Sequence, residues 1–290
     1  MAITQSPVPR GPVTAKLNFS QRPPEGVTAF NYVDTPPAGQ PQRNLVPDPH
    51  QVPITDIRGH ESEFSLDRDA FQVLRNIAPS AEETGSSASN FHDDKFIAEN
   101  YYPEVEALLL SAIPGSTRIY IFDHTIRRAD PNAHRKAVQN VHIDQTAYSA
   151  AKRVHRHMGA DAEALLQGRY RIVNVWRTLN KNPVESMPLA FASSSSLEDK
   201  DVVPVEHRYP EGYIGQTAAI AYNPNQRWYY LSGMTGDERL LLECYDSEGA
   251  KEGSGVAGGR VPHTAFEDPR SRPDAEGRES IEVRALVFGP

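Results

Sequence analysis

The sequence predicts a mostly β domain with flanking helices, an α+β arrangement in which a β-sandwich or jelly roll has helices packed on one face. Helical periodicity before residue 113 gives way, from Gly115 onward, to a series of short strand-like segments. Runs of helices followed by runs of strands are typical of such layered folds. There is no repeated β-α-β alternation and no Gly-x-Gly-x-x-Gly after a strand, which argues against a doubly wound sheet.

The composition of the chain argues against two classes of protein, those that bind nucleic acid and those that span a membrane. The net charge is −8 and no basic cluster is long enough to follow a phosphate backbone, so nucleic acid is not an expected partner. No run of 18 apolar residues exists, which excludes a membrane span on sequence grounds. Cys244 is the only cysteine, so no disulfide can form within the chain, and we expect a reducing, cytoplasmic environment.

The first part of the chain predicts an extended segment followed by helices. Residues 1–60 are rich in proline, and we expect them to form an extended arm packed on a single domain that spans 61–290. A helix is predicted from Ser65 to Ile77, and a second over 93–112 that Pro103 should split in two. Two further helices are expected over 147–157 and 161–167.

The second part predicts strands, most clearly over 168–177. There, strict alternation puts Asn174 on the face of Ile172 and Trp176, and Arg177 on the opposite face. The other expected strands are 117–122, 138–144, 188–192, 216–222, 227–232, 240–245 and 280–288.

A candidate metal site lies in the strand-like segment 138–144. His142 and Asp144 are two residues apart, so on a strand their side chains point to one face and can bind one metal ion. With His263 as third ligand they would form the 2-His-1-carboxylate set of non-haem iron oxygenases. From spacing alone, a half-buried sheet histidine paired with a carboxylate is an equal alternative. The similar pattern at His92-Asp93-Asp94 instead indicates the start of a helix.

A candidate carboxylate-binding site follows. Arg278 lies just before the last expected strand and Ser280 begins it, and on a strand the two share a face. The planar guanidinium of an arginine can bind the distal carboxylate of 2-oxoglutarate in two places. Arg284 lies on the same face and is the alternative anchor. Asn174 and Arg177 are further candidates for binding a co-substrate or substrate carboxylate. The alternative for Arg177 is a structural ion pair with Glu243 or Asp246.

Several segments together resemble the fungal hydroxylase/desaturase family of secondary metabolism, which includes AsaB-like, gibberellin desaturase-like and CmcJ-related proteins. The resemblance covers about residues 115–288, and the segments that carry it are 141–146, 174–177, 188–190, 228–230, 238–241 and 278–284. It implies a double-stranded β-helix (jelly-roll) oxygenase that uses Fe(II), 2-oxoglutarate and O2. By match, His142, Asp144 and His263 are expected iron ligands and Arg278 the expected co-substrate anchor. The chain departs from the family pattern at Thr178 and at 191–196, both close to the expected pocket.

We therefore expect an oxygenase that oxidises an unactivated C–H bond of a small secondary metabolite or amino-acid-derived molecule, by hydroxylation, desaturation or oxidative cyclisation. Its expected partner is this small-molecule substrate, and a homodimer is considered. The alternatives are an iron oxygenase that does not use 2-oxoglutarate and a non-catalytic partner subunit of an oxygenase. A zinc hydrolase is disfavoured because no general base stands beside the site.

Overall fold

Two sheets form the core of the protein. The computed structural model describes residues 8–78, 91–129, 136–249 and 251–289. The smaller sheet has five strands in the order β4-β12-β7-β14-β5, and all its neighbouring pairs are antiparallel. Its strands are β4 (Phe71–Leu74), β12 (Arg239–Asp246), β7 (Tyr170–Thr178), β14 (Ser280–Phe288) and β5 (Arg118–Arg127).

The larger sheet has nine strands and is curled. Its order is β1-β3-β11-β8-β13-β6-β10-β9-β2, with parallel pairing only at β3-β11 and β2-β9 among these described strands. Its strands are β1 (Val13–Ser20), β2 (Ala29–Tyr32), β3 (Pro47–Asp56), β6 (His142–Ile143), β8 (Leu189–Ala192), β9 (Val202–Arg208), β10 (Ile214–Ile220), β11 (Trp228–Tyr230) and β13 (His263–Ala265).

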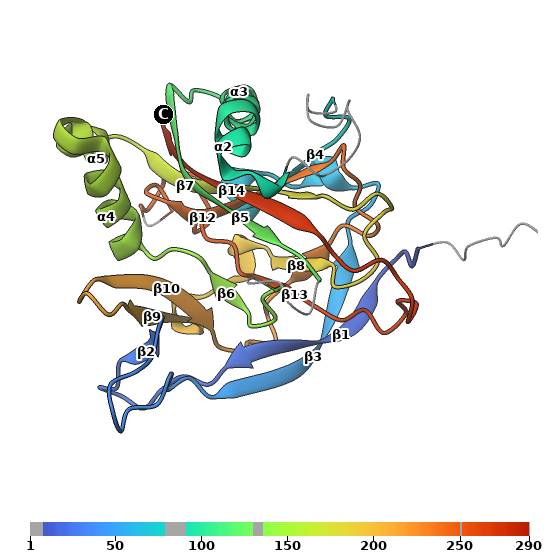
Figure 1. The fold of residues 1–290 in the computed structure, drawn as a ribbon, viewed down its shortest axis with the longest axis horizontal. Helices are drawn as coiled ribbons and strands as arrows, with labels where there is room; N and C mark the ends of the chain where they lie inside the picture. Colours follow the sequence, from blue (N-terminus) through green and yellow to red (C-terminus); the bar gives the residue numbers. More distant parts are fainter. Residues whose placement is uncertain (1–7, 79–90, 130–135, 250, 290) are drawn as a thin grey trace, which may run out of the picture.

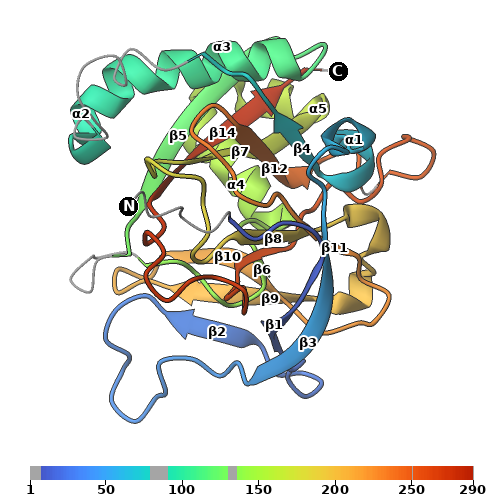
Figure 2. The same ribbon diagram turned by 90° about the vertical axis from the view of Figure 1, so that its right-hand side faces the viewer.

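The molecule is layered, as Figures 1 and 2 show. Helix α3 (Tyr102–Ala112) covers the outer face of the smaller sheet, and the inner face of this sheet meets the central strands of the larger one. Between the sheets, Trp176 of β7 packs in one apolar cluster with Phe191 of β8 and Leu242 of β12. Two facing, mainly antiparallel sheets with helices on one side confirm the predicted fold class.

The proline-rich N-terminal segment is part of the larger sheet. Strands β1 and β3 pair along their whole length, and the sheet curls so that Asn18 of β1 bridges Asn140 beside β6. The buried side chains of these strands, such as Leu17 and Phe19, join the cluster that contains Trp228. Strands β1, β2 and β3 therefore belong to the same sheet as the central strands.

The helices agree with the predictions in part. Helix α4 (Ala147–Met158) and helix α5 (Ala162–Gln167) confirm the two expected after the metal segment, and Asp93 caps α2 (Asp94–Phe96) by accepting from the amides of Lys95 and Phe96. Short 3-10 turns lie at Glu61–Glu63, Gly159–Asp161, Ser194–Ser196 and Asp199–Asp201.

The predicted helix from Ser65 to Ile77 is wrong. Only α1 (Leu66–Asp69) is helical, and Ala70 ends it with a φ of 62° in the left-handed region. The chain then forms β4, whose Phe71 and Val73 are buried, because β12 offers a partner for its backbone. The apolar spacing 71, 74 and 77 fits a helix equally well, and only the pairing with a distant strand decides between the two.

The predicted break at Pro103 is also wrong. The chain stays helical from Asp94 to Ala112, through a π-helical turn at Ile97–Tyr101 in which the Tyr102 amide bonds the Ile97 carbonyl. Proline has no N–H to donate to the preceding turn. A π-helical turn shifts the hydrogen-bonding partners by one residue, which lets the helix absorb the missing donor.

Candidate metal centre

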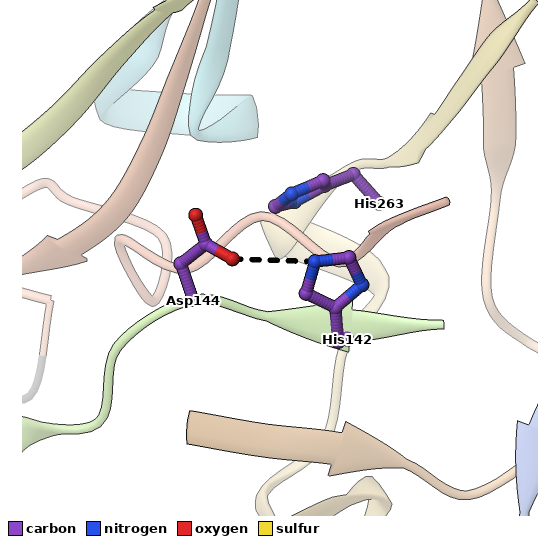
Figure 3. A group of neighbouring side chains, drawn as sticks. All are labelled: His142, Asp144 and His263. Carbon is purple, nitrogen blue, oxygen red and sulfur yellow. Dashed lines mark ion pairs between the residues drawn. The ribbon is translucent and has the colours of Figure 1, made fainter. Parts of the chain in front are cut away.

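Three ligand-type side chains meet between the two sheets. His142 on β6 and His263 on β13 are direct cross-strand neighbours, and Asp144 follows His142 by two residues on the same side. Figure 3 shows the three side chains pointing toward one another. One ligand atom from each lies within 4.8 Å of the other two, and the imidazole ring centroids are 4.4 Å apart. The structure thus brings together the three residues selected from the sequence, although His263 lies far away along the chain.

Both imidazoles are oriented by the backbone. His142 Nδ1 lies 2.8 Å from the Asn140 carbonyl oxygen, and His263 Nδ1 lies 3.2 Å from that of Val261. Each Nδ1–H therefore donates to a carbonyl two residues earlier, which fixes the tautomer and leaves Nε2 as the ligand atom. A histidine that holds a metal is typically fixed in this way through its other nitrogen.

The Asp144 carboxylate is held from the smaller sheet. Its Oδ2 accepts from Asn174 Nδ2 at 2.9 Å and from Arg284 Nε at 3.1 Å. Its Oδ1 lies 3.2 Å from His142 Nε2. Burial would raise the pKa of Asp144, but the charge of Arg284 and the contact with His142 lower it well below its ordinary value. The carboxylate is therefore ionised, with one oxygen turned toward the histidines.

The pKa values of the two histidines are shifted in opposite directions. Burial and the neighbouring His142 lower the pKa of His263 to about 4, so His263 is neutral and offers a lone pair. Burial also acts against the charged form of His142, but its hydrogen bond to Asp144 outweighs this and raises the pKa. Two nitrogen donors and one ionised oxygen facing a common point fit a divalent iron ion. This donor set is the observation on which the metal assignment rests.

Arg278 lies on the inner face of the smaller sheet with an incomplete set of partners. It is buried, Nη1 donates to the Met187 carbonyl at 2.7 Å, and the guanidinium lies 5.7 Å from the centroid of the Trp176 ring. Its buried Nε has no hydrogen-bond partner among the described residues. Burial and the nearby Arg127 lower the pKa of Arg278 to about 10. A desolvated cation without a carboxylate is suited to receive one from a ligand.

Arg284, the alternative anchor, is already engaged by protein groups. Besides Asp144, its guanidinium donates to Asp123 Oδ1 at 3.0 Å and to Glu282 Oε1 at 2.8 Å. Ser280 is buried on the same face of β14, between Arg278 and Glu282. The geometry therefore favours Arg278 over Arg284 as the group that receives a ligand carboxylate.

The structure does not bring Arg177 to the triad. As the alternation predicted, Arg177 lies on the face of β7 opposite to Asn174, with its guanidinium over the rings of Phe91 and Tyr101 at 5.5 and 5.6 Å. The predicted partners Glu243 and Asp246 instead contact Arg171. This placement weighs against a cofactor-binding role for Arg177 and fits a packing role beneath the helical layer.

Two residues near the triad were not selected from the sequence. Glu282 lies on the inner face of β14, and the alternation Arg278, Ser280, Glu282, Arg284 could have revealed it. The other is His207 on β9. Burial and the nearby His142 lower its pKa, and its Nε2 lies 2.9 Å from Thr217 Oγ1. Its segment carried no strand prediction, so no sequence signal placed it near the site.

A 2-His-1-carboxylate set between the two sheets of a jelly roll defines the class of non-haem iron oxygenases. The comparisons lead to the same class. Residues 17–288 match the family model described as "Oxidoreductase/YMDC permease-like domain". The hydroxylase/desaturase poxK of Penicillium oxalicum is 38% identical over 99% of this chain and 94% of its own length. The Fe(II)/2-oxoglutarate-dependent dioxygenase nvfI of Aspergillus novofumigatus is 32% identical over 89% and 90%.

Solved structures agree over nearly the whole fold. The iron and alpha-ketoglutarate-dependent endoperoxidase NvfI has a TM-score of 0.84 at 30% identity, covering 97% of this chain and 99% of its own. The chain thus belongs to the fungal hydroxylase/desaturase family of Fe(II)/2-oxoglutarate-dependent oxygenases, as the resemblance implied. Among the described residues, no helix is long and apolar enough to cross a membrane.

Proposed function

We propose that this enzyme couples Fe(II), 2-oxoglutarate and O2 to the oxidation of an unactivated C–H bond in a small secondary metabolite or amino-acid-derived molecule. The observation that carries the proposal is the set of His142, Asp144 and His263, whose ligand atoms lie within 4.8 Å of one another. The incompletely paired Arg278 supports it. Once bound, iron and 2-oxoglutarate supply the oxidising power. Hydroxylation, desaturation or cyclisation would then depend on which C–H bond the pocket presents.

In this proposal, each residue has a distinct task. His142, Asp144 and His263 hold the iron, and Arg278 with Ser280 binds the distal carboxylate of 2-oxoglutarate. Asn174 and Arg284 act as positioning residues that hold Asp144 through its Oδ2. Arg278 suits its task because it is buried with one nitrogen unpaired, so a bidentate carboxylate would satisfy it.

An anaerobic titration tests the proposal. Protein loaded with Fe(II) is titrated with 2-oxoglutarate while the weak visible charge-transfer band of the chelate is followed. The wild type should develop the band, and Arg278→Ala should need at least about tenfold more 2-oxoglutarate, because a charge-assisted bidentate contact is lost. Arg43→Ala is the matched control, since Arg43 is exposed on the segment between β2 and β3.

Each departure from this result has a definite meaning. Iron binding without the band in the wild type would favour an iron oxygenase that does not use 2-oxoglutarate. No iron binding at all would favour a non-catalytic partner subunit. An unchanged titration in Arg278→Ala would overturn the anchor while leaving the iron ligands in place.

A cytoplasmic location and a homodimer also belong to this proposal. Cys244, the only cysteine, is buried, and burial raises the pKa of its thiol well above the ordinary value, which supports an inert thiol in a reducing compartment. Light scattering of the purified chain tests the homodimer, and a molar mass near the monomer value of 32.1 kDa would contradict it.

A further inference from the structure

A large pocket lies beside helix α4, and its lining residue Asp123 is linked to the candidate ligand Asp144 through Arg284. It encloses about 880 Å³, within the range of small-molecule sites. Its aromatic wall consists of Phe122 on β5 and of Tyr209 and Tyr213, which flank the turn between β9 and β10. The strand register skips Phe122 at a β-bulge, since Arg284 pairs with Asp123 and Ala285 with Ile121. A bulge re-aims the side chains of a strand, and here both Phe122 and Asp123 line the pocket.

Two contacts link this pocket to the metal ligands. Asp123 accepts from Arg284 Nη1 at 3.0 Å, and the Nε of the same guanidinium donates to Asp144 at 3.1 Å. On the other side, Arg153 Nε donates to Oε1 of Gln145, the residue after Asp144, at 3.1 Å. One side chain, that of Arg284, therefore connects the pocket wall to the candidate ligand Asp144.

Three cations of the pocket lack an ion-pair partner in the part of the chain that the structure describes. Lys152, Arg153 and Arg156 of α4 line it, and none of them forms an ion pair with a carboxylate among the described residues. They contact rings and neutral oxygens instead, such as Arg153 over Phe122 at 4.3 Å and Arg156 over Tyr213 at 5.8 Å. In a chain of net charge −8, three such cations in one pocket are unexpected.

The acidic residues of the pocket do not balance these cations. Asp123 is already paired with Arg284, which leaves Glu211 as the one remaining carboxylate in the lining. Burial lowers the pKa of Arg153, which shows that its guanidinium is partly removed from water. Desolvating a cation without a counter-ion is costly, and an anionic ligand would offset that cost.

We propose that this pocket binds the carboxylate end of a ring-containing organic acid, which is the substrate of the reaction at the metal centre. The guanidinium groups of Arg153 and Arg156 would bind the carboxylate, and the aromatic wall would contact the ring. That the bound acid is the substrate rests on the proposed function. Binding of the acid to the pocket does not depend on iron.

The test uses the full chain without metal or co-substrate. Binding of 3-phenylpropanoate and of its neutral amide is measured by ligand-observed NMR titration. The acid should bind at least about tenfold more tightly than the amide, because a charge-assisted contact is worth about that factor. Arg156→Gln should remove most of this preference without harm to folding, since Arg156 is exposed. Arg153→Gln should do the same, and Arg153→Lys, which keeps the charge, should retain part of it.

Arg43→Gln is the matched control and should bind the acid like the wild type. Equal binding of acid and amide, or an unchanged preference in Arg156→Gln, would overturn the proposal. Displacement of the acid by an equal concentration of inorganic phosphate would overturn the ring-bearing carboxylate in favour of a phosphate site. The NMR titration needs no iron, so its result is independent of the 2-oxoglutarate chelate band. Loss of acid binding with the band present contradicts only this inference, whereas loss of the band with acid binding intact contradicts only the proposed function.

Discussion

Asn174 and Arg284 are cross-strand neighbours on β7 and β14, and both donate to the same oxygen of Asp144. The smaller sheet thus holds the carboxylate by Oδ2, while Oδ1 remains beside His142. The two sheets therefore have different roles at the candidate metal site. The larger sheet supplies the three ligand-type side chains, and the smaller one fixes the orientation of the only charged one among them.

Removal of one of these donors should weaken metal binding. Asn174→Ala deletes the 2.9 Å hydrogen bond to Asp144 but leaves Arg284 in place. Partners of this kind typically change metal affinity about 10- to 100-fold, so we expect a loss in that range for Mn(II), measured by electron paramagnetic resonance. The control is Asn182→Ala, whose side chain contacts Glu276 on the surface. Wild-type affinity in Asn174→Ala would show that Arg284 alone orients the carboxylate.

Removal of a ligand should abolish metal binding itself. A metal that binds only the folded state raises the melting temperature, by an amount that grows with its concentration. We expect Mn(II) to raise the melting temperature of the wild type and to leave that of His142→Ala, Asp144→Ala and His263→Ala nearly unchanged. His60→Ala is the control, because His60 is exposed and contacts Glu63. A full metal-dependent shift in any ligand variant would remove that residue from the set.

A partly buried ion cluster, formed by residues of α1, β7 and β12 and by Arg169, should make stability depend on pH. Arg169 and Arg171 face three carboxylates there, those of Asp67, Glu243 and Asp246, so one acid is in excess. Burial, followed by the charge of Asp246, raises the pKa of Glu243 well above its ordinary value of 4.5. Its two carboxyl oxygens have no hydrogen-bond partner among the described residues. Glu243 is therefore an acid whose protonated form the folded state favours.

The sign of the effect follows from linkage. An acid whose pKa is higher in the folded state contributes stability that is fully present below the unfolded pKa and is lost as pH rises toward the folded one. Glu243→Gln imitates the protonated form, so its melting temperature should equal that of the wild type at pH 4 and below, and exceed it increasingly as pH rises toward 8.5. Glu252→Gln, at an exposed position, should show no such trend. A difference that does not change with pH would mean that Glu243 is ionised throughout.

The N-terminal strands should be essential for folding. Phe19 of β1 is buried, with its ring centroid 5.7 Å from that of Trp228 and 5.3 Å from that of Tyr222. Phe19→Ala should lower the free energy of unfolding by about 3–5 kcal/mol, as is typical for a large aromatic side chain removed from a core. Urea unfolding followed by fluorescence measures it, with the partly exposed Phe30→Ala as the milder control. A decrease in the free energy of unfolding of less than about 1 kcal/mol would indicate that β1 contributes little to the stability of the fold.

Local chain geometry explains which parts of the site were predictable. Side chains two residues apart on a strand share a face whatever the rest of the fold does. The shared side of His142 and Asp144, the opposite faces of Asn174 and Arg177, and the common face of Arg278, Ser280 and Arg284 are of this kind. The β character of 168–177 and 280–288 was predictable for the same reason, because it rests on residues adjacent in the chain.

Strand pairing explains what could not be predicted. Only the register of β6 against β13 makes His263 the neighbour of His142. Only the packing of the two sheets against each other lets Arg284 donate to Asp144 and leaves Arg278 with an unpaired nitrogen. The strands β1 to β4 likewise form where distant segments offer backbone partners. By itself, the sequence determined the chemistry that each short segment can present, because side-chain direction is local. The tertiary structure alone decided which of these segments meet, because that choice depends on contacts between residues far apart in the chain.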